Sequence, residues 1–138
     1  MNGYTLGAQI GHVLRRAHQR HTALFAEEFG PFQLTPTQFA VLVTVGQLGE
    51  TSQNQLGRLT AMDPATVQGV VKRLAARQLI VARADPSDGR RSLWGISGEG
   101  EQLLERVLPV ARKVTERTLA PLTQRERQRL LALLEKIG

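Results

Sequence analysis

The chain has 138 residues, of which 41% are hydrophobic and 22% charged, a composition typical of one globular domain and not of a disordered segment. It contains no cysteine, which excludes disulfide bonds, a thiol redox switch and a cysteine-based zinc site. The formal net charge of +6 is consistent with a polyanionic partner such as nucleic acid, because clustered Lys and Arg bind phosphates. Charge alone does not decide this, since many basic proteins bind no nucleic acid.

The sequence also indicates the cellular compartment of the protein. Residues 1–10 lack the basic start and apolar run of a signal peptide. No stretch approaches the ~20 apolar residues of a membrane-spanning helix. We therefore expect a cytoplasmic protein with no membrane partner.

The first element is a long helix. Residues 4–29 carry apolar side chains at helical spacing, which predicts a helix that ends near residue 30. His21 falls inside this apolar stripe, where either a packed helix contact or a ligand-binding role would suit it. One edge of the stripe carries polar side chains that could meet a small anion or a carboxylate across a dimer interface: Gln9, Arg16 and Arg20.

Two short helices follow. A capping box, in which Thr35 is the N-cap and Gln38 the third helical residue, starts the first of them, with Pro36 at the first helical position. The next helix starts in the same way, with Ser52 as cap and Gln55 as its third residue, and we expect it to run to residue 61 or 62. Asp63 then caps a fourth helix after a turn of only about three residues, and this spacing is typical of a helix-turn-helix motif.

The fourth helix has two distinct faces. Apolar side chains recur at a period of 3.6 residues, which predicts a buried face made of Val67, Val70, Val71 and Leu74. The opposite face is small, polar and basic: Ala65, Thr66, Gln68, Gly69, Lys72, Arg73 and Ala76. Two β-like runs then follow, at residues 79–84 and 92–96, on either side of a turn-rich segment 85–91 that carries Arg90 and Arg91. A helix followed by a basic hairpin is typical of DNA-binding proteins.

The C-terminal part predicts two more helices. Ser97 can cap a fifth helix, in which Pro109 should produce a kink between residues 105 and 109. A second capping box, Thr123 to Glu126, starts a last helix with a broad leucine-rich face. This face exceeds what one short helix buries against its own chain, which suggests a partner subunit.

Enzymatic signatures are absent from the sequence. It has no phosphate-binding G-x-x-x-x-G-K-S/T motif, no G-x-S-x-G and no H-E-x-x-H. The three histidines, His12, His18 and His21, have no third metal ligand at a suitable spacing, so we expect no metal and no cofactor. A second non-enzymatic class is a helical protein-interaction module whose basic face does not read DNA. Such a module would not need the hairpin.

The order of these elements resembles that of the MarR family of winged-helix transcription regulators. Two motifs carry the resemblance, which covers essentially the whole chain. The run Asp88, Gly89, Arg90, Arg91 is similar to the family's D-x-R-R wing signature, and residues 96–100 (ISGEG) resemble its L-T-x-x-G segment. Two departures are Ser97 in place of Thr, and Gln78 where the family often has Gly after the recognition helix.

The resemblance implies a mainly α fold with a small β-hairpin wing. A winged helix-turn-helix domain at residues 35–97 would lie between an N-terminal dimerisation helix (1–34) and C-terminal dimerisation helices (98–138), in one intertwined structural unit. The fourth helix would enter the major groove and present Thr66, Gln68, Lys72 and Arg73, while Gly69 lets the backbone approach closely. The wing carries Arg90 and Arg91. Arg90 would enter the minor groove, and Asp88 would orient it by a charge-assisted hydrogen bond.

The resemblance also implies a function. It indicates a ligand-responsive repressor that binds a palindromic DNA operator as a homodimer and is released by a small aromatic or phenolic carboxylate of the salicylate or hydroxynicotinate kind. Candidate effector contacts are His12, Arg16 and His21 on the first helix and Phe39 and Leu42 on the second. The helical periodicity places His12 away from the main apolar stripe. His12 and His21 therefore share one pocket only if a partner or the second helix covers the other face.

Overall fold

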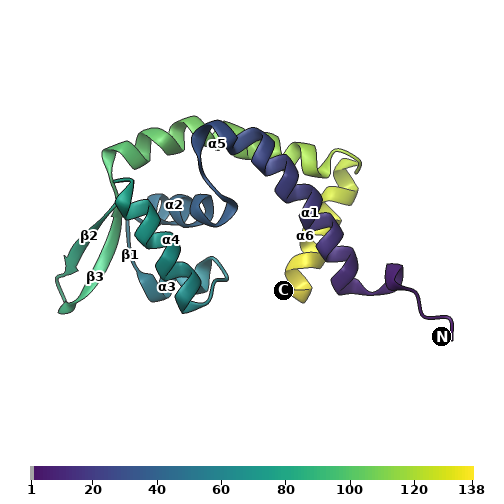
Figure 1. Ribbon diagram of the computed structural model, residues 1–138, viewed down its shortest axis with the longest axis horizontal. Helices are drawn as coiled ribbons and strands as arrows, with labels where there is room; N and C mark the ends of the chain where they lie inside the picture. The colour runs from purple at the N-terminus through teal and green to yellow at the C-terminus, as the bar shows by residue number, and fades with distance from the viewer. Residues whose placement is uncertain (1) are drawn as a thin grey trace. The chain divides into compact units, whose positions relative to one another are not determined.

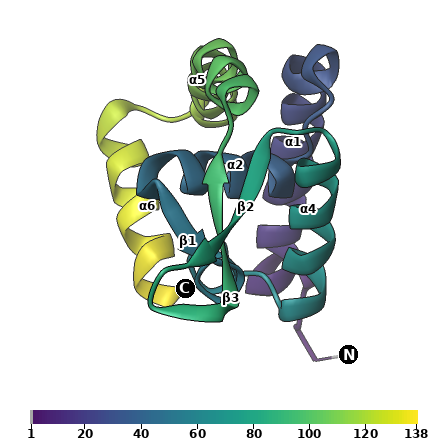
Figure 2. The same ribbon diagram turned by 90° about the vertical axis from the view of Figure 1, so that its left-hand side faces the viewer.

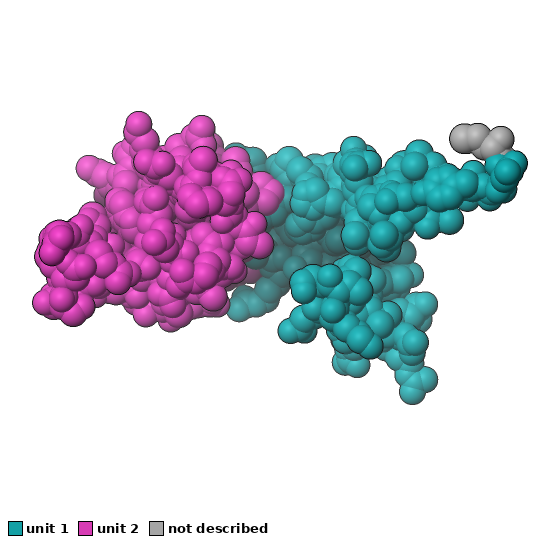
Figure 3. Space-filling model, turned by 90° about the horizontal axis from the view of Figure 1, so that it is seen from below, with its two compact units in different colours: residues 1–30, 110–138 teal, residues 31–109 magenta. Residues whose placement is uncertain are grey.

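The computed structural model describes residues 2–138, which divide into two compact units. The terminal unit combines the first 30 residues with residues 110–138, and the central unit comprises residues 31–109 (Figure 3). Helix α5 (Gly98–Leu119) contributes residues to both units. Among the helices of residues 2–138, none is both long enough and apolar enough to cross a lipid bilayer.

The terminal unit is helical. It contains the short 3-10 helix η1 (Leu6–Ala8), helix α1 (Ile10–Phe29), the second half of α5, and helix α6 (Gln124–Ile137). The first helix was expected from residue 4, but α1 begins at Ile10, because Gln9 adopts an extended backbone and its side chain accepts the His12 N–H at 2.6 Å. The predicted capping box between Thr123 and Glu126 is confirmed at the start of α6.

Polar contacts hold α1 against the second half of α5. The Arg20 guanidinium donates to the carbonyl oxygens of Thr118 at 2.6 Å and Arg117 at 2.9 Å. Arg117 in turn pairs with Glu27 at 2.8 Å and Glu28 at 2.9 Å. Arg20 thereby satisfies carbonyl groups that have no intrahelical partner at the C-terminal end of α5.

The central unit is a winged helix-turn-helix. Its elements, visible in Figures 1 and 2, are the 3-10 turn η2 (Gly30–Phe32), α2 (Pro36–Leu48), β1 (Glu50–Ser52), α3 (Gln53–Leu59), α4 (Pro64–Ala76), β2 (Ile80–Asp85), β3 (Asp88–Ile96) and the first half of α5. The strands form an antiparallel sheet in the order β1-β3-β2. The three-residue strand β1 was not predicted, because it is too short to show an alternating pattern.

The caps of the central unit follow the sequence in part. The Thr35 and Gln38 capping box is confirmed. Ser52 accepts the Gln55 N–H at 3.2 Å, but the Gln55 side chain accepts from the Thr51 hydroxyl at 2.8 Å. Helix α3 ends at Leu59, before the predicted residue 61 or 62, because the backbone turns into the left-handed region at residue 61, with φ 54°.

The core of the central unit lies between helices α2, α3 and α4. All four apolar residues predicted for the fourth helix are buried: Val67, Val70, Val71 and Leu74. They share the interior with Leu42 of α2, Leu56 of α3 and Ile80 of β2, which are 0–1% exposed. Burial of each such side chain contributes roughly 1.5–3 kcal/mol, so this core fixes the position of α4.

The hairpin is tighter than the sequence suggested. Strand β3 begins at Asp88, so the loop is only Pro86 and Ser87, and the two wing arginines lie in a strand and not in the predicted loop 85–91. The Asp85 carboxylate closes the loop by accepting the N–H of Ser87 at 2.9 Å and its hydroxyl at 2.7 Å. These two bonds, with a smaller contribution from the charge of Arg91, lower the pKa of Asp85.

Helix α4 ends in a Schellman motif. Gln78 takes a left-handed conformation with φ 61°, its N–H donates to the Ala75 carbonyl at 2.9 Å, and the Leu79 N–H donates to the Leu74 carbonyl at 3.1 Å. This is the geometry for which glycine is favoured, so the departure at Gln78 leaves the route into β2 intact. Gly100 is required for a different reason, because a Cβ there would overlap the Leu79 carbonyl oxygen.

Candidate nucleic-acid interface

Asp63 organises the start of the exposed α4 surface. Its carboxylate accepts the Thr66 N–H at 2.8 Å and the Thr66 hydroxyl at 2.9 Å. These bonds lower the pKa of Asp63, because they favour its charged form. The proton of the Thr66 hydroxyl is therefore already engaged. Towards solvent Thr66 offers only oxygen lone pairs.

The remaining candidates on α4 are accessible. The side chains of Gln68, Lys72 and Arg73 are exposed. Gly69 lies between them, and a Cβ built there meets nothing nearer than Nη1 of Arg73, at 3.7 Å. A glycine inside a helix costs about 0.5–1 kcal/mol relative to alanine, and packing within the central unit does not require one here. Close approach of a partner to the α4 backbone would explain it.

The wing presents its arginines differently from expectation. Asp88 accepts the main-chain N–H of Arg90 at 3.1 Å, instead of binding the guanidinium as predicted. The carboxylate therefore shapes the strand, and the Arg90 side chain stays exposed. Arg90 and Arg91 lie in a β-bulge, because Ala84 pairs with Ser92 whereas Asp85 pairs with Asp88, and the Arg91 side chain is also exposed.

The two elements that carry the predicted DNA-binding residues reach the same end of the central unit. Figures 1 and 2 both show the tip of the β2–β3 hairpin and the N-terminal end of α4 at the same end of this unit. The polar face of α4 and the wing arginines can therefore face one extended ligand. A double helix with a helix in its major groove and an adjacent minor groove fits that arrangement.

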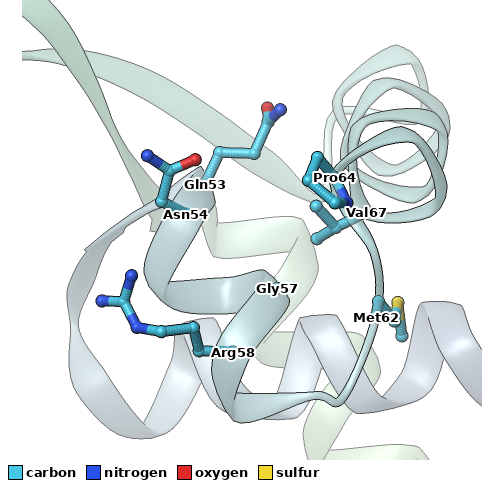
Figure 4. Close-up of a pocket in the computed structure, with 7 residues that line it drawn as sticks. All are labelled: Gln53, Asn54, Gly57, Arg58, Met62, Pro64 and Val67. Carbon is cyan, nitrogen blue, oxygen red and sulfur yellow. The ribbon is translucent and has the colours of Figure 1, made fainter.

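Helix α3 adds a polar surface that the sequence analysis did not single out. Gln53, Asn54 and Arg58 of α3 border a hollow of about 270 Å³, and Pro64 and Val67 of α4 line its other side (Figure 4). In helix-turn-helix proteins the helix that precedes the recognition helix crosses the DNA backbone. That rule, applied to the short run after the Ser52 cap, could have identified these residues.

The candidate effector residues of α1 separate into two places. His12 and Arg16 border a hollow of about 360 Å³ together with Arg20. The Arg16 guanidinium makes no hydrogen bond or ion pair within residues 2–138, whereas that of Arg20 donates to the end of α5. His21 lines a second, more apolar hollow of about 370 Å³, formed by α1, α5 and α6, that also includes His18.

His21 is held within the terminal unit. Its Nδ1 atom lies 3.0 Å from the Thr118 hydroxyl oxygen. Partial burial, with a smaller contribution from His18, lowers the pKa of His21. The ring is therefore predominantly neutral near neutral pH, which is what a packed helix contact requires.

Two further expectations concern the second helix. Phe39 is partly buried, whereas Leu42 has no exposed surface and lies in the core of the central unit, so it forms no pocket wall in this structure. Leu42 was selected from helical spacing alone, which does not distinguish a core position from a pocket wall. Within the described residues, no group of three or more His, Cys, Asp or Glu is placed to hold a metal ion.

Comparison with known proteins agrees with this architecture. A model of the MarR family matches residues 32–91. The HTH-type transcriptional repressor NicR of Pseudomonas putida is 40% identical over 134 residues, which cover 97% of this chain and 85% of NicR. Crystallography of a probable transcriptional regulator from Pseudomonas aeruginosa gives a structure with 51% identity and a TM-score of 0.92, covering 97% of this chain and 100% of that one.

A third similar protein is BpsR of Bordetella bronchiseptica, whose DNA binding is regulated by 6-hydroxynicotinic acid. It is 38% identical, with a TM-score of 0.94, over 99% of this chain and 97% of BpsR. The repressor identity of NicR and the family model agree with the helix-turn-helix and wing described above. The chain belongs to the MarR family of winged-helix transcription regulators.

Proposed function

We propose that this protein is a cytoplasmic repressor that binds a palindromic DNA operator as a homodimer and releases it when a small aromatic carboxylate binds. The observation that carries the DNA-binding part is the exposed polar face of α4, with Gly69 in its middle, on a helix whose N-terminal end lies at the same end of the central unit as the tip of the β2–β3 hairpin. Helix α4 would enter the major groove, where Gln68 reads base edges and Lys72 contacts phosphate. Arg90 would reach into the adjacent minor groove.

The dimer is supported by apolar side chains that the single chain leaves exposed. On α1 and α6 these include Ile10 at 60%, Leu131 at 56% and Ile137 at 66% exposed. A second copy would cover these faces and set two α4 helices about 34 Å apart, the spacing of successive major grooves. Sedimentation should show a dimer at micromolar concentration, and joint replacement of Leu130 and Leu134 by Glu should abolish both the dimer and DNA binding. A folded monomer of the wild-type chain at that concentration would contradict the assembly.

The effector proposal starts from Arg16. Its guanidinium has no partner within the described chain, and His12 lies one helical turn before it on the same hollow. A carboxylate is the ligand that an unpaired guanidinium binds best, through two parallel hydrogen bonds. The regulation of BpsR by 6-hydroxynicotinic acid supports an aromatic acid of the hydroxynicotinate class here.

DNA binding is tested first, with a duplex that the wild-type protein selects from a random-sequence pool. The logarithm of the affinity should fall linearly with the logarithm of salt concentration, because each phosphate contact releases bound counterions. A selected duplex with two inverted half-sites would support the palindrome. Failure to select any sequence, with weak salt-dependent binding to all duplexes, would contradict the regulator proposal.

The effector is tested with 6-hydroxynicotinic acid on the complex with that duplex. We expect this acid to dissociate the wild-type complex, and nicotinamide, which lacks the carboxylate, to leave it intact. Arg16→Ala should keep its DNA affinity and lose the response. Arg15→Ala removes an equally exposed charge from the same helix and should respond as wild type. Equal release of the Arg16 variant would remove Arg16 from the site.

A further inference from the structure

We propose that Arg77 is a positioning residue, which couples the recognition helix α4 to the segment through which the chain enters the central unit. The inference rests on the DNA-binding function proposed above and adds a route by which that binding and the terminal unit affect each other. It starts from one side chain at the C-terminal end of α4, directly after Ala76.

Arg77 spans two successive main-chain carbonyls that are distant in sequence. Its Nη1 atom donates to the carbonyl oxygen of Gln33 at 2.7 Å, and Nη2 donates to that of Phe32 at 3.2 Å. A guanidinium carries its donors in a fixed planar fork, so one side chain can hold both acceptors at once. An ammonium group is a compact point charge on a flexible stem and does not reproduce this geometry.

The segment that Arg77 holds is the beginning of the central unit. The chain passes from the terminal to the central unit between Gly30 and Pro31, directly before the two carbonyls. Gln33 has φ 54°, a left-handed conformation that is uncommon for a residue other than glycine and that surrounding contacts must maintain. Leu34, the next residue, is 5% exposed and anchors the segment in the core. Arg77 and the buried Leu34 thus both hold the entry segment.

The second chain connection between the units lies next to a residue that also contacts Phe32. The chain leaves the central unit between Pro109 and Val110, within α5. Arg106, one turn before Pro109, places its guanidinium carbon 5.3 Å from the centre of the Phe32 ring, a cation–π contact. Phe32 is therefore held by an arginine of α5 at its ring and by Arg77 at its carbonyl.

These contacts link α4 to both of the connections between the units. Arg77 is exposed and lies outside the hydrophobic core, so its contribution is to position α4 relative to the entry segment. Displacement of the entry segment would pull on the C-terminal end of α4 through Arg77. Linkage is reciprocal. DNA binding that fixes α4 must therefore also stabilise the entry segment and the end of α1 that precedes it.

Hydrogen exchange of the full chain, free and bound to the selected duplex, tests this coupling. In the wild type we expect the duplex to slow exchange in residues 25–35 by about fivefold or more, the low end of usual coupling between sites. Arg77→Ala should bind the duplex within about threefold of wild type, with the same salt slope, and should lose this protection. Arg112→Ala, which removes an exposed charge of α5, should retain it.

Arg77→Lys separates positioning from simple charge. This variant keeps the positive charge but cannot donate to both carbonyl oxygens at once. We therefore expect it to lose most of the protection from hydrogen exchange while it binds DNA as the wild type does. It also serves as the test if the alanine variant does not fold. Retained protection in both variants, absence of protection in the wild type, or a salt slope reduced by about one in Arg77→Ala would overturn the proposal. Failure of the wild type to select a duplex is a separate result that contradicts the proposed function itself.

Discussion

The hydroxyl of Ser97 donates to the carbonyl oxygen of Gln78 at 2.6 Å, and this contact joins the start of α5 to the end of the recognition helix. The Ser97 hydroxyl oxygen also accepts the Gly100 N–H at 3.0 Å and so caps α5. Gly100 cannot carry a side chain without overlapping the Leu79 carbonyl. The I-S-x-x-G sequence at residues 96–100 is therefore the corner at which α4, β2 and α5 meet.

Ser97→Ala should destabilise the protein by about 0.5–2 kcal/mol, because it removes a helix cap and a hydrogen bond to the α4 corner. Ser97→Thr keeps the hydroxyl and should remain close to wild type. Chemical denaturation measures both effects. Ser92→Ala, at an exposed strand position, is the control and should change stability little. A Ser97→Ala variant as stable as this control would show that the cap contributes nothing measurable.

Gln78→Gly should raise stability by about 0.5–1 kcal/mol, because glycine adopts the left-handed conformation with φ 61° without strain. The same change at Gln102, an exposed position inside α5, should lower stability by a similar amount, because there glycine only adds unfolded-state freedom. Thermal unfolding of the two variants gives the comparison. Two changes of the same sign would contradict the assignment of strain to Gln78.

The recognition helix and its caps could be predicted from the sequence because their signals are local. The 3.6-residue period placed Val67, Val70, Val71 and Leu74 in the core, and two of the three predicted capping boxes formed, those of α2 and α6. The hairpin loop was predicted too long, because the Asp85 bonds to Ser87 that tighten it are not a periodic feature. The contacts of Arg77 could not be predicted from the sequence, because they join residues that are 44 and 45 positions apart.

In the candidate site, too, local features could be predicted from the sequence and specific contacts could not. The polar face of α4 follows from helical periodicity, whereas the role of a side chain such as Asp88 depends on which donor it meets. The sequence suggested the Arg90 guanidinium, and the structure gives the Arg90 main-chain N–H. For the effector, the helical periodicity already placed His12 away from the apolar stripe that holds His21, and the two residues line different hollows.

Arg90→Ala should weaken binding to the selected duplex by about 1–3 kcal/mol and reduce the salt slope by about one, because one cation leaves the DNA. The fold should stay intact, since the side chain is exposed and Asp88 binds only the main chain. Gel shifts over a series of salt concentrations measure both quantities. Arg125→Ala removes an exposed charge from α6 and serves as control. Wild-type affinity and slope in Arg90→Ala would place the wing away from DNA.

The lowered pKa of His21 predicts a pH dependence of stability. Because the folded state favours the neutral ring, the unfolded chain binds more protons between the folded pKa and the ordinary value of 6.5. Stability is therefore complete above pH 6.5 and falls as the pH drops through this window. Unfolding free energies measured across it should show a smaller slope for His21→Gln. A slope for His21→Gln equal to that of the wild type would contradict this assignment.

Gly69→Ala separates stability from DNA binding, because the two effects have opposite signs. Space for a Cβ is present, with Nη1 of Arg73 at 3.7 Å, so alanine should stabilise helix α4 by about 0.5–1 kcal/mol. If the α4 backbone approaches DNA at this position, the added methyl group must also weaken binding to the selected duplex. Denaturation and gel shifts on one preparation measure the pair. Ala76→Gly, at the C-terminal end of the same helix, is the reciprocal control and should lose stability while its DNA affinity is unchanged. A Gly69→Ala protein that is more stable and binds DNA as tightly as wild type would show that the groove does not meet α4 at Gly69.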